Sequence, residues 1–255
     1  MAFIKPEQQF NPDALHNLVI GIAADMGKHD SGMHHHHKAQ LLYASAGCMR
    51  FSLADTQVVL PPTRAAWLPA GVEHHVTMRN VVAYRSLYFE PEAVASLPSE
   101  VTIFHVNPLL KALIDTMSYW PWNKPRYSQH NAFALFCEEL ENAKAENLAL
   151  PLPQDKRLQT WLKQVLQQEM QPANLKEMAI EIGASERTIS RIFSSQTGMA
   201  YQAWRQQWRL LSAIEQLAAG TSVAQAGFNL QFSSDSAFIS FFKQYTGTTP
   251  AQYFK

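Results

Sequence analysis

The sequence predicts an α+β protein of two domains, an antiparallel β-barrel with flanking helices followed by an all-α domain with two helix-turn-helix motifs. Three observations predict this fold class. Short apolar segments separated by Gly, Pro and Asp recur from Leu18 to about Phe89, as they do in antiparallel sheets. Apolar residues then recur every three or four positions, which is the period of an amphipathic helix. The 255 residues are enough for two domains of ordinary size.

We expect the first domain to span residues 1–148, with helices from about residue 107, and the second to span residues 155–255. The stretch AENLALPLPQD between them contains Pro151 and Pro153. It predicts an interdomain linker at residues 149–154. Two apolar stripes at helical spacing precede it: Leu109, Leu110, Leu113, Ile114 and Met117, then Phe133, Phe136, Cys137 and Leu140.

A first helix-turn-helix is predicted at about residues 174–197. Gly183 ends one amphipathic helix, and Ser185 is a good N-cap for the next, with Glu186 in its first turn. A helix of roughly 20 residues follows, from Met199 to Ala219, and at about 1.5 Å per residue it spans about 30 Å. Gly220 ends it.

A second helix-turn-helix is predicted at about residues 222–246. One helix begins at Val223, a turn lies near 229–232, and the next helix is capped by Ser233 or Ser234. We expect that helix to bury Phe238, Phe242 and Tyr245. Two such units on a rigid spacer could enter two successive major grooves, because a B-DNA turn is about 34 Å.

The outward faces of the two second helices carry side chains that reach base edges and phosphates in DNA. Arg187 and Arg191 are the strongest candidates for base readout, whereas Lys243 is better placed to hold a phosphate. The candidate DNA-binding residues are Ser185, Glu186, Arg187, Thr188, Ser190 and Arg191 in the first unit, and Ser233, Ser234, Asp235, Ser236 and Lys243 in the second.

At these positions the chain resembles the AraC/XylS family of bacterial transcription regulators. The matching residues are Ser185, Arg187, Arg191, Phe193, Gly198, Arg209, Leu210, Phe232, Ser236, Phe238, Phe242, Lys243, Gly247, Thr249 and Pro250. One position departs from the family pattern, because Gln231 stands where the family usually has Gly before Phe232. The chain also resembles, more faintly, regulators of nitroimidazole efflux. The resemblance implies a DNA-binding regulator that responds to a small molecule and controls a nearby transporter or metabolic gene.

Within the strand-rich region two fragments resemble the motifs of cupin barrels. His34, His36, Gln40 and Gly47 fit the first motif, except that Gln40 replaces its Glu, and Pro69, Gly71 and His74 fit the second. Two readings stay open. His34, His36 and His74 could hold a divalent metal, although Gln is a poorer ligand than Glu. Alternatively, a small barrel can hold one small ligand, with His34, His36, Gln40, Trp67 and His74 as pocket walls. Trp67 could equally belong to the core of the barrel.

Charge and composition favour a regulator with a sensor half and a DNA-binding half. Lys and Arg number 21, as do Asp and Glu, which argues against a generally basic nucleic-acid binder. Residues 1–154 carry 11 basic and 14 acidic side chains, and residues 155–255 carry 10 and 7, so their net charges are −3 and +3. Cys48 and Cys137 have no metal or redox spacing, so we expect buried, reduced thiols. No signal peptide or membrane span is predicted, and we expect the protein in the cytoplasm, with no membrane partner.

We expect three partners: double-stranded DNA, a small-molecule effector and RNA polymerase. No cofactor is expected. The family resemblance also implies a homodimer through the helices beside the barrel, although these helices could equally pack on their own barrel. Two alternatives compete with the sensor hypothesis. One is a metal-dependent cupin enzyme with an appended helical domain, and the other is a ligand-independent regulator whose barrel only dimerises.

Overall fold

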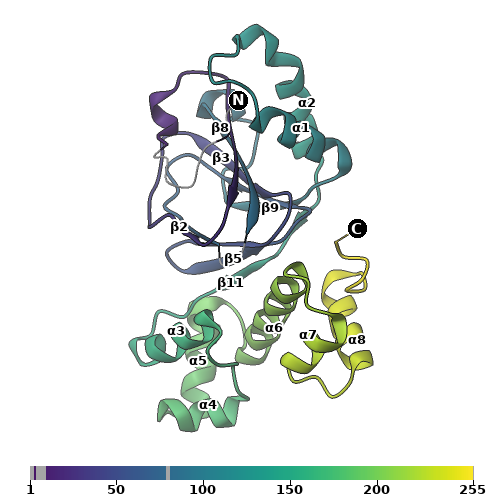
Figure 1. Ribbon diagram of the computed structural model, residues 1–255. Coiled ribbons are helices and arrows are strands. Elements are labelled where there is room, and N and C mark those ends of the chain that lie inside the picture. The colour runs from purple at the N-terminus through teal and green to yellow at the C-terminus, as the bar shows by residue number, and fades with distance from the viewer. Residues whose placement is uncertain (1–2, 4–9, 79–80, 255) are drawn as a thin grey trace. The chain divides into compact units, whose positions relative to one another are not determined.

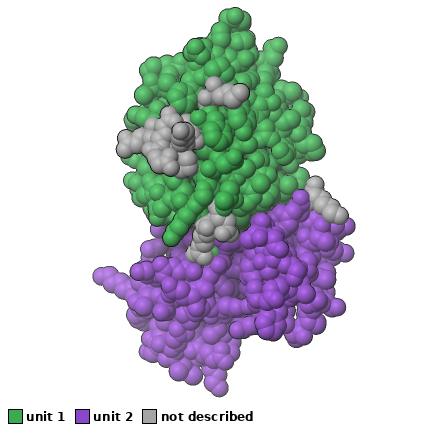
Figure 2. Space-filling model, in the orientation of Figure 1, with its two compact units in different colours: residues 1–53, 59–148 green, residues 54–58, 149–255 purple. Residues whose placement is uncertain are grey.

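A computed structural model describes residues 3, 10–78 and 81–254. The chain divides into two compact units, residues 1–53 with 59–148 and residues 54–58 with 149–255 (Figures 1 and 2). The first unit is rich in strands and the second consists mainly of helices, so the predicted two-domain α+β fold class is confirmed.

The strands form two antiparallel sheets. The strands are β1 (Val19–Met26), β2 (His29–Asp30), β3 (Ala39–Ala44), β4 (Met49–Ser52), β5 (Thr56–Leu60), β6 (Arg64–Leu68), β7 (His75–Met78), β8 (Val82–Phe89), β9 (Thr102–His105), β10 (Ala145–Glu146) and β11 (Ala149–Pro151). One sheet has the order β1-β8-β3-β6-β9-β10 and the other β11-β5-β4-β7-β2. Within the described residues the pairing therefore gives two sheets and not the single closed barrel that we expected.

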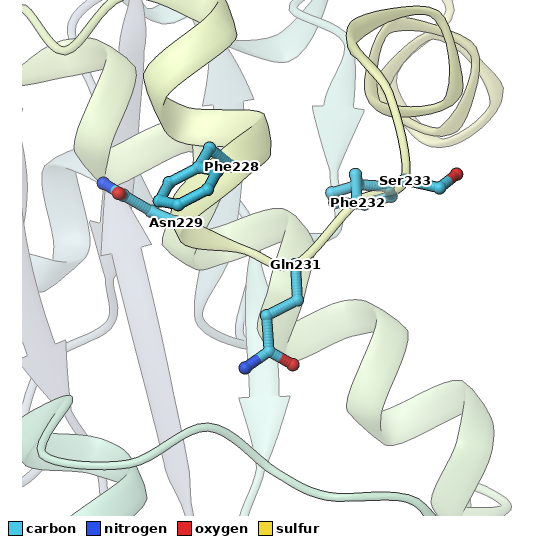
Figure 3. Close-up of a pocket in the computed structure, with 5 residues that line it drawn as sticks. All are labelled: Phe228, Asn229, Gln231, Phe232 and Ser233. Carbon is cyan, nitrogen blue, oxygen red and sulfur yellow. The ribbon is translucent and has the colours of Figure 1, made fainter.

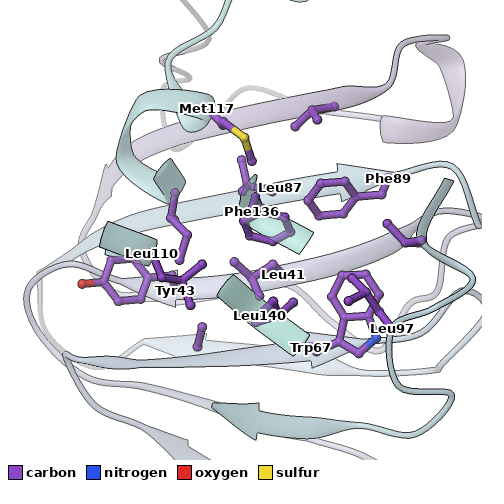
Figure 4. Close-up of a cluster of buried hydrophobic side chains, with 14 of the residues drawn as sticks. Leu41, Tyr43, Trp67, Leu87, Phe89, Leu97, Leu110, Met117, Phe136 and Leu140 are labelled. Atoms are coloured by element: carbon purple, nitrogen blue, oxygen red, sulfur yellow. The ribbon is translucent and has the colours of Figure 1, made fainter. Parts of the chain in front are cut away.

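Alternation along β3 and β8 separates an apolar face of the larger sheet from a polar one. Leu87 and Phe89 on β8 pack with Leu41 on β3 in the main apolar cluster of the unit (Figure 4). Ser86 and Tyr88 alternate with these two residues along β8, and their side chains instead contact Gln40 on the opposite face. This is the period of two that a strand imposes on its side chains.

Helices α1 (Pro108–Ser118) and α2 (His130–Glu141) cover the apolar face of this sheet. Leu110, Ile114 and Met117 of α1 are buried there, as the apolar stripe predicted. Leu109 was expected in the same stripe but is 45% exposed, because one helical position is about 100° and turns it away from the sheet. The two cysteines form no disulfide and are half-buried, and burial raises the pKa of the Cys137 thiol to about 11.

The helical unit contains α3 (Gln159–Gln167), α4 (Leu175–Ile182), α5 (Glu186–Thr197), α6 (Tyr201–Ala218), α7 (Val223–Asn229) and α8 (Asp235–Thr246). Part of the segment predicted as a linker forms a strand. Ala149–Pro151 is strand β11, whose Leu150 pairs with Gln57 of β5. Among the described residues, no helix is both long and apolar enough to cross a bilayer.

Gly21 on β1 lies directly against the backbone of α1. A Cβ atom built there would lie 2.1 Å from the carbonyl oxygen of Met117 and 2.7 Å from the Cα atom of Ser118. Both are backbone atoms of α1, so they cannot turn aside as a side chain would. A larger residue at position 21 must therefore push α1 away from the sheet.

We predict that Gly21→Ala lowers the free energy of unfolding by about 3 kcal/mol, because overpacking in a dense core costs roughly this much. Urea denaturation followed by circular dichroism measures the change. Gly27→Ala is the matched control, since a Cβ atom there would meet nothing within 4 Å. Equal stability of the two variants would contradict the tight contact between β1 and α1.

Candidate nucleic-acid interface and ligand pocket

The first helix-turn-helix is formed by α4 and α5. Gly183 caps α4 with a φ of 69°, in the left-handed region that favours glycine. The hydroxyl of Ser185 accepts a hydrogen bond of 3.2 Å from the Thr188 backbone N–H and so caps α5. The turn and its cap are where the sequence predicted them.

The buried side of α5 anchors this unit. Phe193 packs within a group of aromatic rings from α3 and α6, with ring centroids 4.9 Å from Tyr201 and 5.2 Å from Trp204. Trp161 lies 6.3 Å from Phe193 in the same group. Because Ile189, Ile192 and Phe193 face inward, the opposite side of α5 is left for contacts outside the fold.

That opposite side carries the two arginines that the sequence singled out. Arg187 and Arg191 are both exposed and lie four residues apart, on one face of α5. Neither has an ion pair or hydrogen bond with the part of the chain that the structure describes. Ser185 and Glu186 are exposed beside them, whereas Thr188 and Ser190 are half-buried. The hydroxyl of Thr188 lies 2.9 Å from that of Ser185 and so takes part in the cap.

The second helix-turn-helix is formed by α7 and α8. Ser234, and not Ser233, caps α8, accepting a hydrogen bond of 3.2 Å from the Ala237 backbone N–H. The exposed candidates of this unit are Ser233, Ser234, Asp235, Ser236 and Lys243. Phe238 and Phe242 are buried as expected, but Tyr245 is 43% exposed. The Tyr245 ring instead packs on Phe241 of the same helix, with ring centroids 4.8 Å apart.

The turn between α7 and α8 borders a pocket of about 690 Å³, lined by Phe228, Asn229, Gln231, Phe232 and Ser233 (Figure 3). Gln231 has a φ of 58°, so it occupies the left-handed conformation in which glycine is usual. The departure from the family pattern noted in the sequence therefore falls at a strained backbone position.

In the strand-rich unit, three histidines come together around an isolated β-bridge. His34 and His74 form an antiparallel bridge, with each backbone N–H donating to the other carbonyl at 3.0 and 2.9 Å. Their ring centroids are 4.4 Å apart, and the His36 ring lies 5.3 Å from that of His74. The sequence prediction that His34, His36 and His74 converge is thus matched by the geometry.

Gln40 links this group to the polar face of β8. Its Oε1 atom lies 3.0 Å from His36 Nε2, and its Nε2 atom donates to Ser86 Oγ at 2.8 Å and to the Tyr88 hydroxyl at 3.0 Å. Among the described residues, no group of three or more His, Cys, Asp or Glu side chains is arranged to hold a metal ion. With the Gln40 amide engaged in this network, the residues do not fit the metal site of a cupin enzyme.

Trp67 lies away from the histidines. Its side chain is 1% exposed within the apolar cluster under α1 and α2, and its indole N–H donates to the Pro98 carbonyl at 2.9 Å. Trp67 pairs with Leu41, whereas Gln40 pairs with Leu68, so Trp67 and Gln40 point to opposite faces of the sheet. We therefore remove Trp67 from the candidate pocket.

His74 has an acceptor without a partner. Its Nδ1 atom lies 2.9 Å from the Val72 carbonyl oxygen, which can only accept, so Nδ1 carries the proton in the neutral ring. The remaining Nε2 atom is buried and has no hydrogen-bond partner in the part of the chain that the structure describes. Burial, with smaller contributions from the nearby His34 and His36, lowers the pKa of His74 to about 4. Burial also lowers the pKa of His36.

We predict that His74 makes the strand-rich unit less stable in acid. Its pKa is about 6.5 in the unfolded chain and about 4 in the folded chain, so between these values protons bind preferentially to the unfolded state. Stability should fall by about 1.4 kcal/mol per pH unit as the pH drops through this window. Urea unfolding at pH 7 and pH 5 measures the slope. His74→Asn keeps a donor for Val72 without titrating, and a variant slope as steep as that of the unchanged chain would contradict the assignment.

Comparison with known proteins agrees with both units. Residues 178–255 match the model of a helix-turn-helix domain, and residues 16–169 match that of the AraC-like ligand binding domain. The HTH-type transcriptional regulator NimR of Escherichia coli (strain K12) is 27% identical over 247 residues, covering 96% of this chain and 90% of NimR.

Two further proteins share part of this similarity. The bifunctional transcriptional activator/DNA repair enzyme Ada of Escherichia coli (strain K12) is 33% identical over 89 residues, which are 35% of this chain and 25% of Ada. Among solved structures, fatty-acid-bound ToxT from Vibrio cholerae strain SCE256 aligns at 10% identity with a TM-score of 0.39, covering 94% of this chain and 96% of that of ToxT.

The AraC-like ligand binding model alone covers more than half of the 255 residues, and the helix-turn-helix model covers most of the remainder. The chain therefore belongs to the AraC family of helix-turn-helix transcription regulators that carry a ligand-binding domain.

Proposed function

We propose that this regulator reads one DNA sequence through α5 and positions itself on the duplex through α8. The observation that carries the proposal is the pair Arg187 and Arg191, which are exposed on one face of a capped helix and have no partner among the residues that the structure describes. Arg recognises guanine through two hydrogen bonds in the major groove. Ser233 and the N-cap Ser234 precede α8, Asp235 and Ser236 begin it, and all four side chains are short, whereas Lys243 in its last turn is suited to a phosphate.

The length of α6 supports contact of both helix-turn-helix units with one duplex. Helix α6 has 18 residues and so is about 27 Å long, which is close to the roughly 34 Å of one B-DNA turn. Two recognition helices at the ends of such a spacer suit two contact blocks on one face of a duplex.

The experiment that tests DNA recognition is binding of the purified protein to random genomic fragments at near-physiological salt, followed by sequencing of the retained DNA. One motif with two contact blocks about a helical turn apart is expected. The gene beside that motif, which we expect to encode a transporter or a metabolic enzyme, would indicate which small molecules to test. Retention that is salt-sensitive and independent of sequence would contradict the proposal.

On the selected site we predict different effects for the two helices. Arg191→Ala should weaken binding by roughly 1–3 kcal/mol and relax specificity, because it removes a base contact. Lys243→Ala should weaken specific and random DNA alike and lower the salt slope by about one, because it removes one phosphate contact. Fluorescence anisotropy over a salt series measures both. Equal losses on specific and random DNA for Arg191→Ala would refute the assignment of base readout to α5.

We also propose that the effector binds at the polar face where His34, His36, Gln40 and His74 meet. The unpartnered Nε2 acceptor of His74 supports an effector that carries an N–H or O–H donor. Such a donor would remove the free-energy cost of a buried, unsatisfied acceptor. The proposed effector pocket therefore omits Trp67.

A thermal-shift screen tests the effector pocket. A compound that binds should raise the unfolding temperature of the unchanged chain, and His74→Leu should abolish the shift while leaving DNA binding intact. His35→Ala is the control, since His35 is exposed and should keep the shift. A shift that survives in His74→Leu would place the ligand elsewhere. Stoichiometric metal in the purified protein would favour the alternative of a metal-dependent enzyme, and neither metal nor ligand would favour a barrel that only dimerises.

The remaining partners are proposals of the same kind. The outer sides of α1 and α2 expose Leu109 and Leu135, and Tyr127, just before α2, is 81% exposed. These side chains support a homodimer through this surface, and a monomer in sedimentation equilibrium would contradict it. Contact with RNA polymerase and a cytoplasmic location follow from the proposed role in transcription. In-vitro transcription and cell fractionation test these two proposals.

A further inference from the structure

The turn between α7 and α8 contains one residue, Gln231, whose side chain is exposed and whose backbone is strained. Gln231 has a φ of 58°, and a residue with a Cβ atom is disfavoured there. Strained residues persist when the surrounding structure determines their conformation, and they concentrate at functional positions. The neighbours of Gln231 therefore indicate whether this strain has a use.

Arg209 of α6 clamps the turn on both sides of Gln231. Its Nη2 atom donates to the Leu230 carbonyl at 2.7 Å, and its guanidinium carbon lies 3.8 Å from the centroid of the Phe232 ring. The Gln231 backbone N–H also donates to the Phe228 carbonyl at 3.0 Å. These contacts hold residues 230 and 232, so the conformation of Gln231 between them is imposed by the fold.

The other polar side chain at the start of this turn is engaged by the protein. The Asn229 side chain accepts from Gln225 at 2.7 Å and donates to Gln216 at 2.8 Å, and Gln171 donates to the Asn229 carbonyl. By contrast, the Gln231 side chain is exposed and has no hydrogen-bond partner among the described residues. Figure 3 shows it extending from the turn in a different direction from Phe228 and Phe232.

We infer that Gln231 is a DNA-contacting residue of the second helix-turn-helix, whose amide donates a hydrogen bond to a backbone phosphate. The amide belongs to the turn that leads into the Ser234 cap of α8, ahead of the residues that face base edges. Side-chain amides are frequent donors to phosphate oxygens, and such contacts set position without reading sequence. This inference rests on the proposed function and names one further residue of the same interface.

Gln231→Gly tests the inference because DNA affinity should fall without any loss of stability. Glycine accepts the left-handed conformation, so the variant should unfold at the same or a higher temperature than the unchanged chain. Binding to specific and random DNA should weaken about threefold to tenfold, the loss expected for one hydrogen bond. The salt slope should not change, because the lost donor is uncharged.

Two variants sharpen the result. Gln231→Lys should bind DNA at least as tightly as the unchanged chain and raise the salt slope by about one, since a charged donor would then face the phosphate. Gln168→Gly is the matched control, because Gln168 also has a positive φ, 62°, at the end of α3. It should leave DNA affinity unchanged.

Unaltered affinity in Gln231→Gly would overturn the inference, and a loss confined to the specific site would overturn the assignment to a phosphate. Both results require that the unchanged chain binds its selected site and that Arg191→Ala weakens that binding. If the unchanged chain binds no DNA sequence selectively, the proposed function fails, and this failure is distinct from failure of the inference about Gln231.

Discussion

Helix α6 is the element on which the helical unit depends. Its first turns supply Tyr201 and Trp204 to the aromatic group around Phe193, which fixes α5. One turn further on, Arg209 clamps the turn that precedes α8. Both recognition helices are therefore held by α6, but through different interactions. Packing of aromatic rings holds α5, whereas a hydrogen bond from Arg209 to a carbonyl oxygen and its contact with the Phe232 ring hold the turn before α8. Burial lowers the pKa of Arg209, but from a starting value so high that the guanidinium remains charged.

The strand-rich unit depends on a different constraint, the strict alternation of side chains along β3 and β8. Because the period is two, a single strand supplies Leu87 to an apolar cluster and Ser86 to a polar network. Helices α1 and α2 shield the apolar side, and close contact at Gly21 holds α1 against the sheet. Polar groups are thereby concentrated on the other side, where an unpartnered acceptor at His74 would be costly without a ligand.

The success of sequence prediction differed between the two units for a physical reason. Helix ends are local, so Gly183 and the Ser185 cap could be located from neighbouring residues alone. The face on which a strand residue points depends on pairing partners far along the chain. The sequence consequently left open whether Trp67 lines the pocket or the core, since its register with Leu41 leaves no trace in the neighbouring residues.

Other features of the sequence had equally little local signal. Pro151 suggested a linker, yet an edge strand tolerates proline, and the residues around it pair with β5. Neither the contact of Gly21 with α1 nor the network around Gln40 could be predicted, because each joins segments that are distant in the chain. The spacing of the cupin-like motifs in the sequence was enough to predict the histidine group. The hydrogen bond of His74 Nδ1 to Val72 and the lack of a partner for its Nε2 atom among the described residues could not be predicted, because both depend on the folded structure.

The two helix-turn-helix units differ in ways that bear on how a regulator divides affinity from specificity. The first turn uses Gly183 at a positive φ without strain, and the helix after it presents two exposed arginines that have no partner within the described residues. The second places Gln231 at a positive φ, holds it with Arg209, and presents serines, an aspartate and one lysine. Arginine can recognise guanine through two hydrogen bonds, whereas hydroxyl and amide groups are frequent donors to phosphate oxygens. In the proposed division of roles, the strained conformation of Gln231 helps to position the second unit on the duplex. The first unit can then be selective without supplying all of the binding energy.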